Sequence, residues 1–345
     1  MQLHFLIPGD INTLTGGYIY NKRMVNGLLN NGHSVEVHSL INDFPFPSPE
    51  SKKKCTETLV AIPKGEVIIF DSLVFGAIPD LLKKIKRFHP FIALIHLPLS
   101  MGTGYSADQK NRILILEKES FGYADLIIVT SPFTRNLLIE MGVKPLCIVI
   151  VIPGVEVLLQ KTKYNPVPHK LITVSNYTPN KGYLLLINAL SELKHLKWTL
   201  DCYGNPKFDP EYFKEISDLI DQNNLTNRIF LHSAVSGKEL SEAYVNSDLL
   251  IHPSEFETYG MVLTEALSHG IPVIASLCGA ISQTVPSTMG IFFKVNDKDS
   301  LGETIKKLLQ NESQYQKLCA EAATYNPQLW GKSISEFEET VESVI

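Results

Sequence analysis

Short apolar runs alternate with longer amphipathic stretches from one end of the chain to the other. Apolar strands separated by helical segments are typical of parallel sheets that are buried on both faces. The first set of predicted strands covers 3–8, 34–40, 66–70, 91–96, 126–131 and 148–153. The second set covers 171–176, 198–204, 228–234, 248–254, 272–276 and 290–295. The pattern therefore predicts an α/β protein.

Two sets of strands favour two doubly wound, Rossmann-like domains rather than one. Prolines and a loss of periodicity between residues 153 and 170 indicate a linker. We expect an N-terminal domain over 1–153, a C-terminal domain over 154–326 and a final helix within 327–345. That helix either stays on the second domain or crosses back to the first. Two such domains are expected to face a central cleft, where open α/β sheets bind their ligands.

The composition is that of a globular protein, with 44% hydrophobic and 19% charged residues and a net charge of −5. No sustained basic excess is present, which argues against a nucleic-acid partner. The five cysteines are scattered without a C-x-x-C pair, which favours a reducing compartment. The chain starts without a basic leader and has no apolar run of membrane length. We expect a cytoplasmic protein whose oligomeric state the sequence leaves open.

The stretch 252–267 carries two glutamates eight positions apart, Glu257 and Glu265. The pattern places Glu257 in a strand-to-helix loop and Glu265 about one turn into the following helix. Eight residues of helix span about 12 Å. The paired carboxyls of retaining glycoside hydrolases lie only about 5–5.5 Å apart. The two carboxylates are therefore expected to contact different parts of a long ligand.

A predicted helix N-terminus lies between these two glutamates, near Gly260, Met261 and Val262. The amide groups of a helix start favour a phosphate or diphosphate. Carboxylates accept hydrogen bonds from paired hydroxyls. The order hydroxyl acceptor, phosphate site, hydroxyl acceptor matches sugar, diphosphate and ribose, so the stretch predicts a nucleotide-diphosphate sugar as ligand.

Five further features accompany the segment 255–276, which contains this pair of glutamates. In order along the chain they are Gly16-Gly17, His96, 129–143, 151–156 and 180–182. Together they resemble the retaining glycosyltransferases of the GT-B fold, in particular glycosyltransferase family 4 (group 1). The resemblance implies two Rossmann-like domains that face a central cleft, with the acceptor side on the first domain and the donor side on the second.

The resemblance also implies a role for each matching residue. The catalytic residues would be His96 near the donor sugar, Glu257 on a sugar hydroxyl and Lys181 on the diphosphate. Glu265 would hold the ribose hydroxyls. The donor-binding set would be Gly16, Gly17, Lys181, Tyr259, Gly260, Met261, Val262 and Glu265. The family requires neither a cofactor nor a metal ion, so no metal ligands are expected.

The implied reaction moves a hexose-type sugar from a UDP- or GDP-sugar to an unidentified acceptor with retention of configuration. Two positions depart from the family pattern: Asn176 stands where an arginine is usual, and Gln283 where a glutamate is common. These departures keep one alternative open, a catalytically silent GT-B subunit that binds nucleotide sugar or a partner. A second alternative is a GT-B epimerase or phosphorylase.

Two segments each have a functional and a purely structural interpretation. The basic amphipathic segment 79–90 suggests peripheral contact with the inner face of a membrane, but covering the sheet of its own domain is the favoured interpretation. Asp297, Lys298 and Asp299 resemble a metal-binding D-x-D motif. They come just before a helical run, so helix capping is favoured there.

Overall fold

The computed structural model describes residues 1–344, which form two compact units. Unit 1 comprises 1–154 and the C-terminal segment from Leu329, and unit 2 comprises 155–328. The division lies one residue after the 153/154 boundary expected from the sequence. The C-terminal helix α14 (Trp330–Glu342) belongs to unit 1.

Unit 1 contains a six-stranded parallel sheet in the order β2-β1-β3-β4-β5-β6. Every residue of β3, β4 and β5 is buried, as expected for strands covered on both faces. The strands are β1 (Gln2–Pro8), β2 (Ser34–Leu40), β3 (Val67–Asp71), β4 (Phe91–Ile95), β5 (Leu126–Val129) and β6 (Ile148–Ile150). The α-helices besides α14 are α1 (Gly16–Asn30), α2 (Pro49–Ala61), α3 (Ser72–Phe75), α4 (Pro79–Ile85), α5 (Ala107–Phe121) and α6 (Pro132–Glu140).

Unit 2 contains a second six-stranded parallel sheet, in the order β12-β11-β10-β7-β8-β9. Its strands are β7 (Lys170–Val174), β8 (Thr199–Gly204), β9 (Ile229–Ser233), β10 (Leu249–His252), β11 (Val273–Ser276) and β12 (Gly290–Phe293). Its α-helices are α7 (Tyr183–Ser191), α8 (Pro210–Gln222), α9 (Gly237–Val245), α10 (Met261–Ser268), α11 (Ile281–Thr284), α12 (Lys298–Gln310) and α13 (Glu312–Ala322). The predicted α/β fold with two doubly wound parallel sheets is confirmed.

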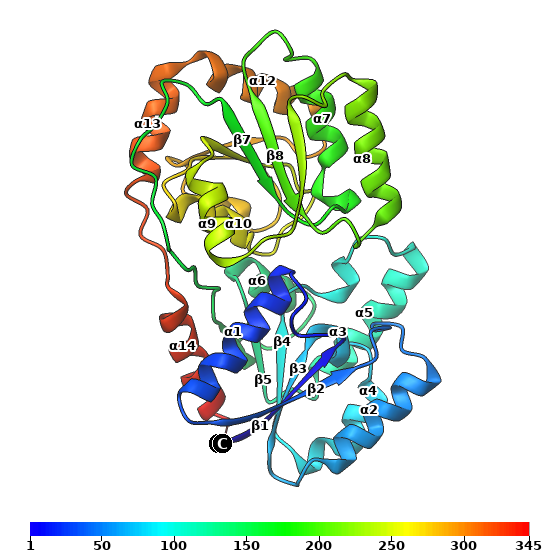
Figure 1. Ribbon diagram of the computed structural model, residues 1–345. Coiled ribbons are helices and arrows are strands. Elements are labelled where there is room, and N and C mark those ends of the chain that lie inside the picture. The colour runs from blue at the N-terminus through cyan, green and yellow to red at the C-terminus, as the bar shows by residue number, and fades with distance from the viewer. Residues whose placement is uncertain (345) are drawn as a thin grey trace. The chain divides into compact units, whose positions relative to one another are not determined.

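Alternation along the strands of unit 2 divides its core between the two faces of the sheet. Leu171 packs with residues of α7, α8 and α12, whereas its neighbour Ile172 packs with residues of α9, α10 and α11. Successive side chains of a strand point to opposite faces, so an apolar run supplies both layers. Figure 1 shows α7 and α8 beside β7 and β8.

The last helix completes unit 1 by packing against α1, and Figure 1 shows α14 beside it. A Cβ added to Gly27 of α1 would lie 2.4 Å from Ile334 Cγ2, so glycine allows the two helices to approach closely. Tyr20 makes an edge contact with the Trp330 ring, the centroids being 6.1 Å apart. His33 Nε2 lies 2.5 Å from Glu338 Oε1, which ties α14 to the start of β2.

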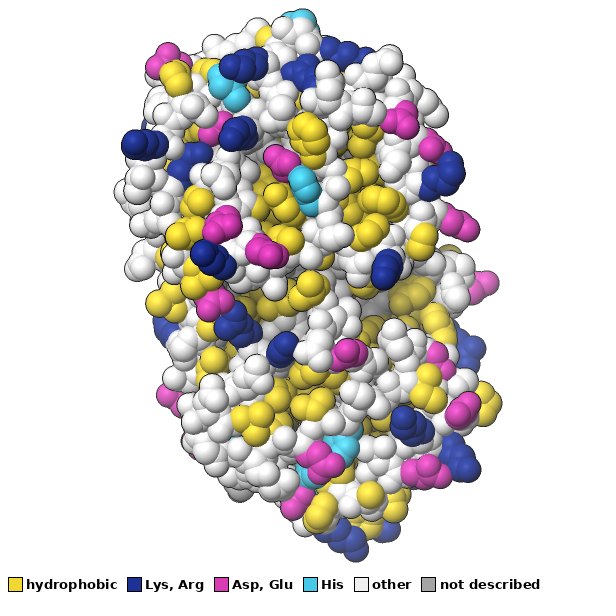
Figure 2. Space-filling view, in the orientation of Figure 1, with side chains coloured by type: hydrophobic (Ala, Val, Ile, Leu, Met, Phe, Trp, Pro, Cys, Tyr) yellow, Lys and Arg dark blue, Asp and Glu magenta, His cyan; other side chains and the backbone are white. Residues whose placement is uncertain are grey.

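The structural interpretations of the segments 79–90 and 297–299 are confirmed. Leu82 and Ile85 of α4 are buried in the core of unit 1, so this helix covers the sheet with its apolar face. Asp297 caps α12 by accepting a hydrogen bond from the Ser300 amide at 2.9 Å. Residues 1–344 contain no helix with the length and apolar character of a membrane span. On the face shown in Figure 2, Lys and Arg side chains are interspersed with Asp and Glu.

Candidate functional site

Glu257 in the β10–α10 loop is paired with two other side chains of unit 2. Its Oε1 lies 2.6 Å from Lys181 Nζ and 2.8 Å from His252 Nε2. The Glu257 side chain is 14% exposed, and that of His252, the last residue of β10, is 2% exposed. One carboxylate oxygen therefore accepts from two donors on different segments of the chain.

The order of the sheet explains why these segments meet. Lys181 follows β7 and Glu257 follows β10, and β7 and β10 are neighbouring strands. Since the strands are parallel, the loops after them leave the same edge of the sheet. Gly182 brings the two loops into contact: it has φ +71°, and a Cβ there would lie 2.2 Å from the Pro253 carbonyl oxygen. The turn is fastened by a 2.9 Å hydrogen bond from the Glu255 amide to the Asn180 carbonyl.

A third loop, after β11, holds the backbone of Glu257 from the other side. Gly279 has φ +50°, and a Cβ there would lie 1.9 Å from the Glu257 carbonyl oxygen. That oxygen accepts a 2.8 Å hydrogen bond from the Ala280 amide. β11 is adjacent to β10 on the side opposite β7, so the Glu257 loop is held by the loops on both sides.

The charge of Glu257 is fixed by these partners. Burial alone would raise the pKa of its carboxyl group, but the Lys181 ammonium and the His252 hydrogen bond together hold that pKa well below its usual range. The carboxylate requires His252 Nε2 to carry the proton of their hydrogen bond. Glu257 is therefore an anionic hydrogen-bond acceptor at neutral pH.

Glu265, on the second turn of α10, has a different partner. Tyr244 donates its hydroxyl to Glu265 Oε2 at 2.9 Å. Burial, the Glu265 charge and this hydrogen bond raise the pKa of Tyr244 well above its ordinary value, so the phenol stays protonated and donates. His269 supports the same turn through a 2.7 Å hydrogen bond from Nδ1 to the Glu265 carbonyl oxygen. The two glutamates are thus held independently.

Between the two glutamates, α10 begins at the glycine expected from the sequence. Gly260 has φ +85° and precedes the first helical residue, Met261. The first amide groups of a helix have no carbonyl partner within it, so those of Met261 and Val262 can face an anion. Tyr259 is half-buried, and its carbonyl oxygen accepts from Thr284 Oγ1 at 2.7 Å.

The predicted residues of unit 1 gather at the carboxyl edge of its own sheet. A Cβ added to Gly17 would lie 3.1 Å from His96 Cδ2, so the histidine ring, just after β4, packs closely on the start of α1. His96 Nε2 lies 2.7 Å from Asn21 Oδ1, and Asn21 Nδ2 donates to Asp71 Oδ2 at 2.8 Å. Gly16 is exposed at the first position of α1.

His96 is held as a neutral imidazole. Burial lowers its pKa, and the nearby Asp71 carboxylate opposes that effect only in part. Because an amide oxygen accepts from Nε2, the ring carries its proton there, and Nδ1 is left as the acceptor.

The structure thus divides the predicted residues between the two units. Lys181 contacts Glu257 directly, whereas Glu265 lies on the following helix; Gly17 and His96 belong to unit 1. Sequence reasoning did not single out four side chains that support these groups, namely Asn21, Asp71, Tyr244 and His252. His252 carried a signal, since it ends the strand that leads to Glu257. The other three acquire their contacts only through the order of strands and the packing of helices.

The two departures from the family pattern lie near the same edge of unit 2. Asn176 follows β7, and its Oδ1 lies 3.4 Å from the Asn205 amide of the loop after β8. Gln283 lies on α11 and is exposed. An amide therefore links two loops at the position where the family usually has a cation.

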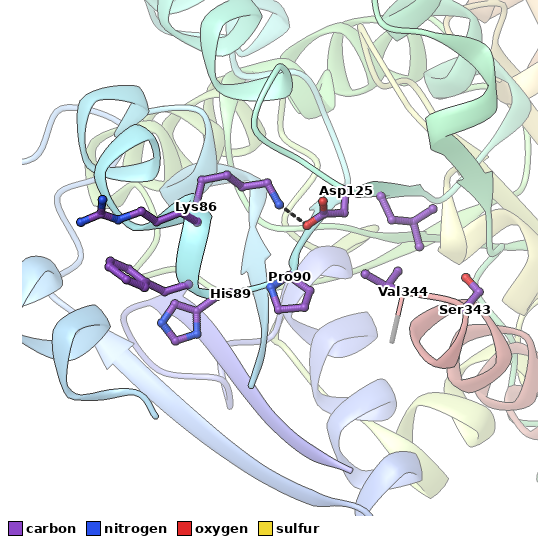
Figure 3. A pocket seen from close by; sticks show the side chains of 9 residues that line it. Lys86, His89, Pro90, Asp125, Ser343 and Val344 are labelled. Carbon is purple, nitrogen blue, oxygen red and sulfur yellow. Dashed lines mark hydrogen bonds and ion pairs between the residues drawn. The ribbon is translucent and has the colours of Figure 1, made fainter. Parts of the chain in front are cut away.

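A separate pocket of about 550 Å³ lies in unit 1 at the amino ends of β4 and β5. Figure 3 shows Lys86 paired with Asp125 on its wall, with His89, Pro90, Ser343 and Val344 nearby. None of the predicted site residues lines it. It lies at the opposite edge of the sheet from His96, so it belongs to a different region.

The comparison with protein families gives a match for most of unit 2: residues 156–325 match the family described as "Glycosyl transferases group 1". One curated relative is the MMP alpha-(1->4)-mannosyltransferase of Mycolicibacterium hassiacum. It is 21% identical over 309 residues, which cover 83% of this chain and 72% of the relative. The next curated matches span about half of the relatives' length or less.

Solved structures resemble nearly the whole chain. Sucrose-phosphate synthase from Thermosynechococcus elongatus superposes with a TM-score of 0.82 at 18% identity and covers 99% of this chain and 98% of the other. Anabaena HepE in complex with UDP-glucose superposes with a TM-score of 0.78 at 17% identity and covers 99% and 100%. At these identities the likeness shows a shared two-domain α/β fold.

Proposed function

Through residues 156–325 the chain belongs to the group 1 glycosyl transferases, and we propose that it is a retaining hexosyltransferase that uses a UDP- or GDP-sugar. The proposed acceptor is a second molecule that the residues do not identify, and the proposed transfer needs no metal ion. The single observation that carries this proposal is the placement of Lys181, Glu257 and His252 beside the start of α10.

Lys181 and the start of α10 supply the positive potential that a diphosphate needs. The Lys181 ammonium has three donors and gives one to Glu257, so it has donors left for a phosphate oxygen. The amides of Met261 and Val262 would add a second set of donors. Such groups stabilise the charge that grows on the leaving diphosphate as the glycosidic bond breaks.

Glu257 and Glu265 would hold the two ends of the donor. The Glu257 carboxylate keeps its charge, which suits it to accept hydrogen bonds from a sugar hydroxyl. Glu265, oriented by Tyr244, would accept from the ribose hydroxyls. In unit 1, Gly17 and the neutral His96 would contribute backbone access and a ring nitrogen for the donor sugar.

Retention without a dedicated base is proposed to follow a front-face route. The leaving phosphate oxygen would take the proton of the acceptor hydroxyl on the face from which it departs, so no further protein base is needed. The UDP-glucose complex of a structural relative supports UDP as a first choice of nucleotide.

A ligand panel in chelator tests the donor part of the proposal. UDP, GDP and ADP, each with and without a hexose, are added at about 100 times Kd, where binding stabilises the fold by about 2.7 kcal/mol. We expect one nucleotide family to raise the melting temperature, and Glu265→Ala to remove that shift. Glu239→Ala, an exposed glutamate on α9 of the same unit, is the matched control and should keep it.

A transfer assay then separates the proposal from its alternatives. We expect hexose transfer to an acceptor from a broad panel without added metal, with the anomeric configuration of the donor retained. Donor conversion without an acceptor would indicate an epimerase. Tight donor binding without turnover over the whole panel would indicate a silent subunit. Asn176→Arg would then be the first substitution to test.

A further inference from the structure

His4 is a polar exception within a buried apolar strand. It is 2% exposed and lies between Leu3 and Phe5 of β1, which are both fully buried. Both ring nitrogens have partners: Nδ1 lies 2.9 Å from His38 Nε2, and Nε2 lies 2.5 Å from Glu66 Oε2. The sequence gives no hint of this cluster, because its members come from β1, from β2 and from the residue before β3.

Sheet register brings the cluster together. His4 of β1 is directly opposite Glu36 of β2, and His38 lies two residues further along β2, on the same face as Glu36. Glu66 precedes β3, the other neighbour of β1. One donor atom each from His4, Glu36 and His38 lies within 4.8 Å of the others.

We propose that His4, Glu36 and His38 bind a divalent transition-metal ion such as Zn²⁺. Two imidazole nitrogens and a carboxylate oxygen are the donors that zinc accepts in sites whose fourth position is left to water. With Zn–N distances of about 2.0–2.1 Å, neighbouring ligands of a tetrahedral ion lie about 3.3 Å apart. The present spacings are 2.9 Å from His4 Nδ1 to His38 Nε2 and 3.7 Å from His4 Nδ1 to Glu36 Oε2.

To bind an ion, the side chains of His38 and Glu36 would have to shift. His38 and Glu36 lie on β2, which is an edge strand, and the Glu36 side chain is 60% exposed. With His4 Nδ1 as the acceptor, His38 donates from Nε2. A shift of that proton to His38 Nδ1, which lies 3.8 Å from Glu36 Oε1, frees the lone pair of Nε2 for an ion, and this shift leaves the number of protons in the cluster unchanged.

Glu66 orients the buried ligand. Its carboxylate accepts from His4 Nε2, so the lone pair of Nδ1 points at His38 and Glu36. A carboxylate behind a ligating histidine fixes the tautomer and raises the basicity of the ring, and its loss typically costs 10–100-fold in metal affinity. The ion would tie the edge strand β2 to β1, in the amino half of β1 and away from Gly17 and His96.

The test uses the full chain without an affinity tag, stripped with chelator and desalted. CoCl₂ is titrated while the visible absorption of tetrahedral Co²⁺ is followed, and ZnCl₂ is then added in competition. We expect one ion per chain with nitrogen and oxygen ligands. His38→Ala and Glu36→Gln should each weaken binding at least 10-fold, and Glu66→Gln should weaken it 10–100-fold.

A second group in unit 1 provides the matched control. Donor atoms of His33, Glu338 and Glu342 also lie within 4.8 Å of one another. His33→Ala should leave the affinity unchanged. The proposal is overturned if no ion binds, if His38→Ala has no effect while its circular dichroism matches wild type, if His33→Ala abolishes binding, or if the spectrum shows thiolate ligands.

Discussion

In both units the candidate residues lie at the carboxyl edge of a six-stranded parallel sheet. The charges and the hydrogen-bond partners of these residues differ between the units. In unit 2, an ionised Glu257 is bound by Lys181 and by His252. In unit 1, His96 is neutral and donates to the uncharged amide of Asn21. In unit 2 the contacts join loops that follow neighbouring strands, whereas in unit 1 they join the loop after β4 to helix α1, which follows β1.

Charged groups therefore form the candidate site of unit 2, whereas a neutral hydrogen bond holds the candidate histidine of unit 1. The proposed donor would carry an anionic diphosphate between the hydroxyls of its sugar and of its ribose, and unit 2 has a cation and a carboxylate within hydrogen-bond distance of each other. The neutral imidazole of His96 would offer a hydrogen-bond acceptor to a ligand without adding a second cation. Asp71 still carries a charge in unit 1, but it reaches His96 mainly through Asn21.

The largest expected effect comes from removing the cation of unit 2. Lys181→Met should lower kcat by about 10²–10³-fold, since donors that stabilise developing charge contribute on that scale. Lys298→Met is the matched control because the Lys298 ammonium also pairs with a glutamate, Glu192, but at an exposed position. Steady-state kinetics with the identified donor provide the measurement. Equal kinetics in the two variants would remove Lys181 from the mechanism.

The next effect tests the backbone packing that holds Glu257. Gly279→Ala should destabilise unit 2 by about 3 kcal/mol, because left-handed backbone strain adds to a contact with the Glu257 carbonyl oxygen. Gly237→Ala has a similar φ of +56° but meets nothing within 4 Å. It should cost only about 1 kcal/mol. Denaturant unfolding compares the two variants, and equal losses would leave backbone strain as the only effect.

A smaller effect should appear in the pH dependence of stability. The folded-state pKa of Glu257 is depressed, so its contribution is present above the unfolded-state pKa of about 4.3 and is lost as pH falls toward the folded value. We expect the free energy of unfolding of wild type to fall below about pH 4. Glu257→Gln should flatten that fall. An unchanged slope in denaturant unfolding between pH 5 and pH 3, as approximate limits, would contradict the pairing.

The smallest effect is expected in unit 1. Asp71→Asn removes the charge that raises the pKa of His96, so burial should then lower that pKa further. Asparagine can still accept from the Leu73 amide, as the Asp71 carboxylate does at 2.9 Å, but its Nδ2 then faces Asn21 Nδ2, so the hydrogen bond from Asn21 is lost together with the charge. NMR titration of His96 gives the pKa directly. A rise in the pKa of His96 would contradict the assignment of Asp71 as the charge that raises it.

Much of the fold could be read from the sequence because burial on both faces leaves a local trace. The predicted strands 91–96 and 272–276 correspond to β4 and β11 within a residue at each end. Strand ends were less precise where polar residues follow: the strand predicted over 126–131 stops at Val129, because Ser131 caps α6 through the Thr134 amide at 3.0 Å.

The candidate site could be predicted only in part from the sequence, because only some of its residues lie close together along the chain. Glu257, Glu265 and the glycine before α10 could be recognised because they lie within one short stretch. The pairing of Lys181 with Glu257 joins residues 76 positions apart. The sequence therefore suggested Lys181 as a partner for the diphosphate but not as the partner of Glu257.

By itself, the sequence determined which segments form strands, where the linker begins, and which acidic and glycine residues surround the start of α10. The tertiary structure decided which loops meet. A run of apolar residues encodes burial but not the identity of the neighbouring strand, and strand order and register bring Lys181 near Glu257 and His4 opposite Glu36. The partners that fix the charge of Glu257 and the tautomer of His96 follow from that order.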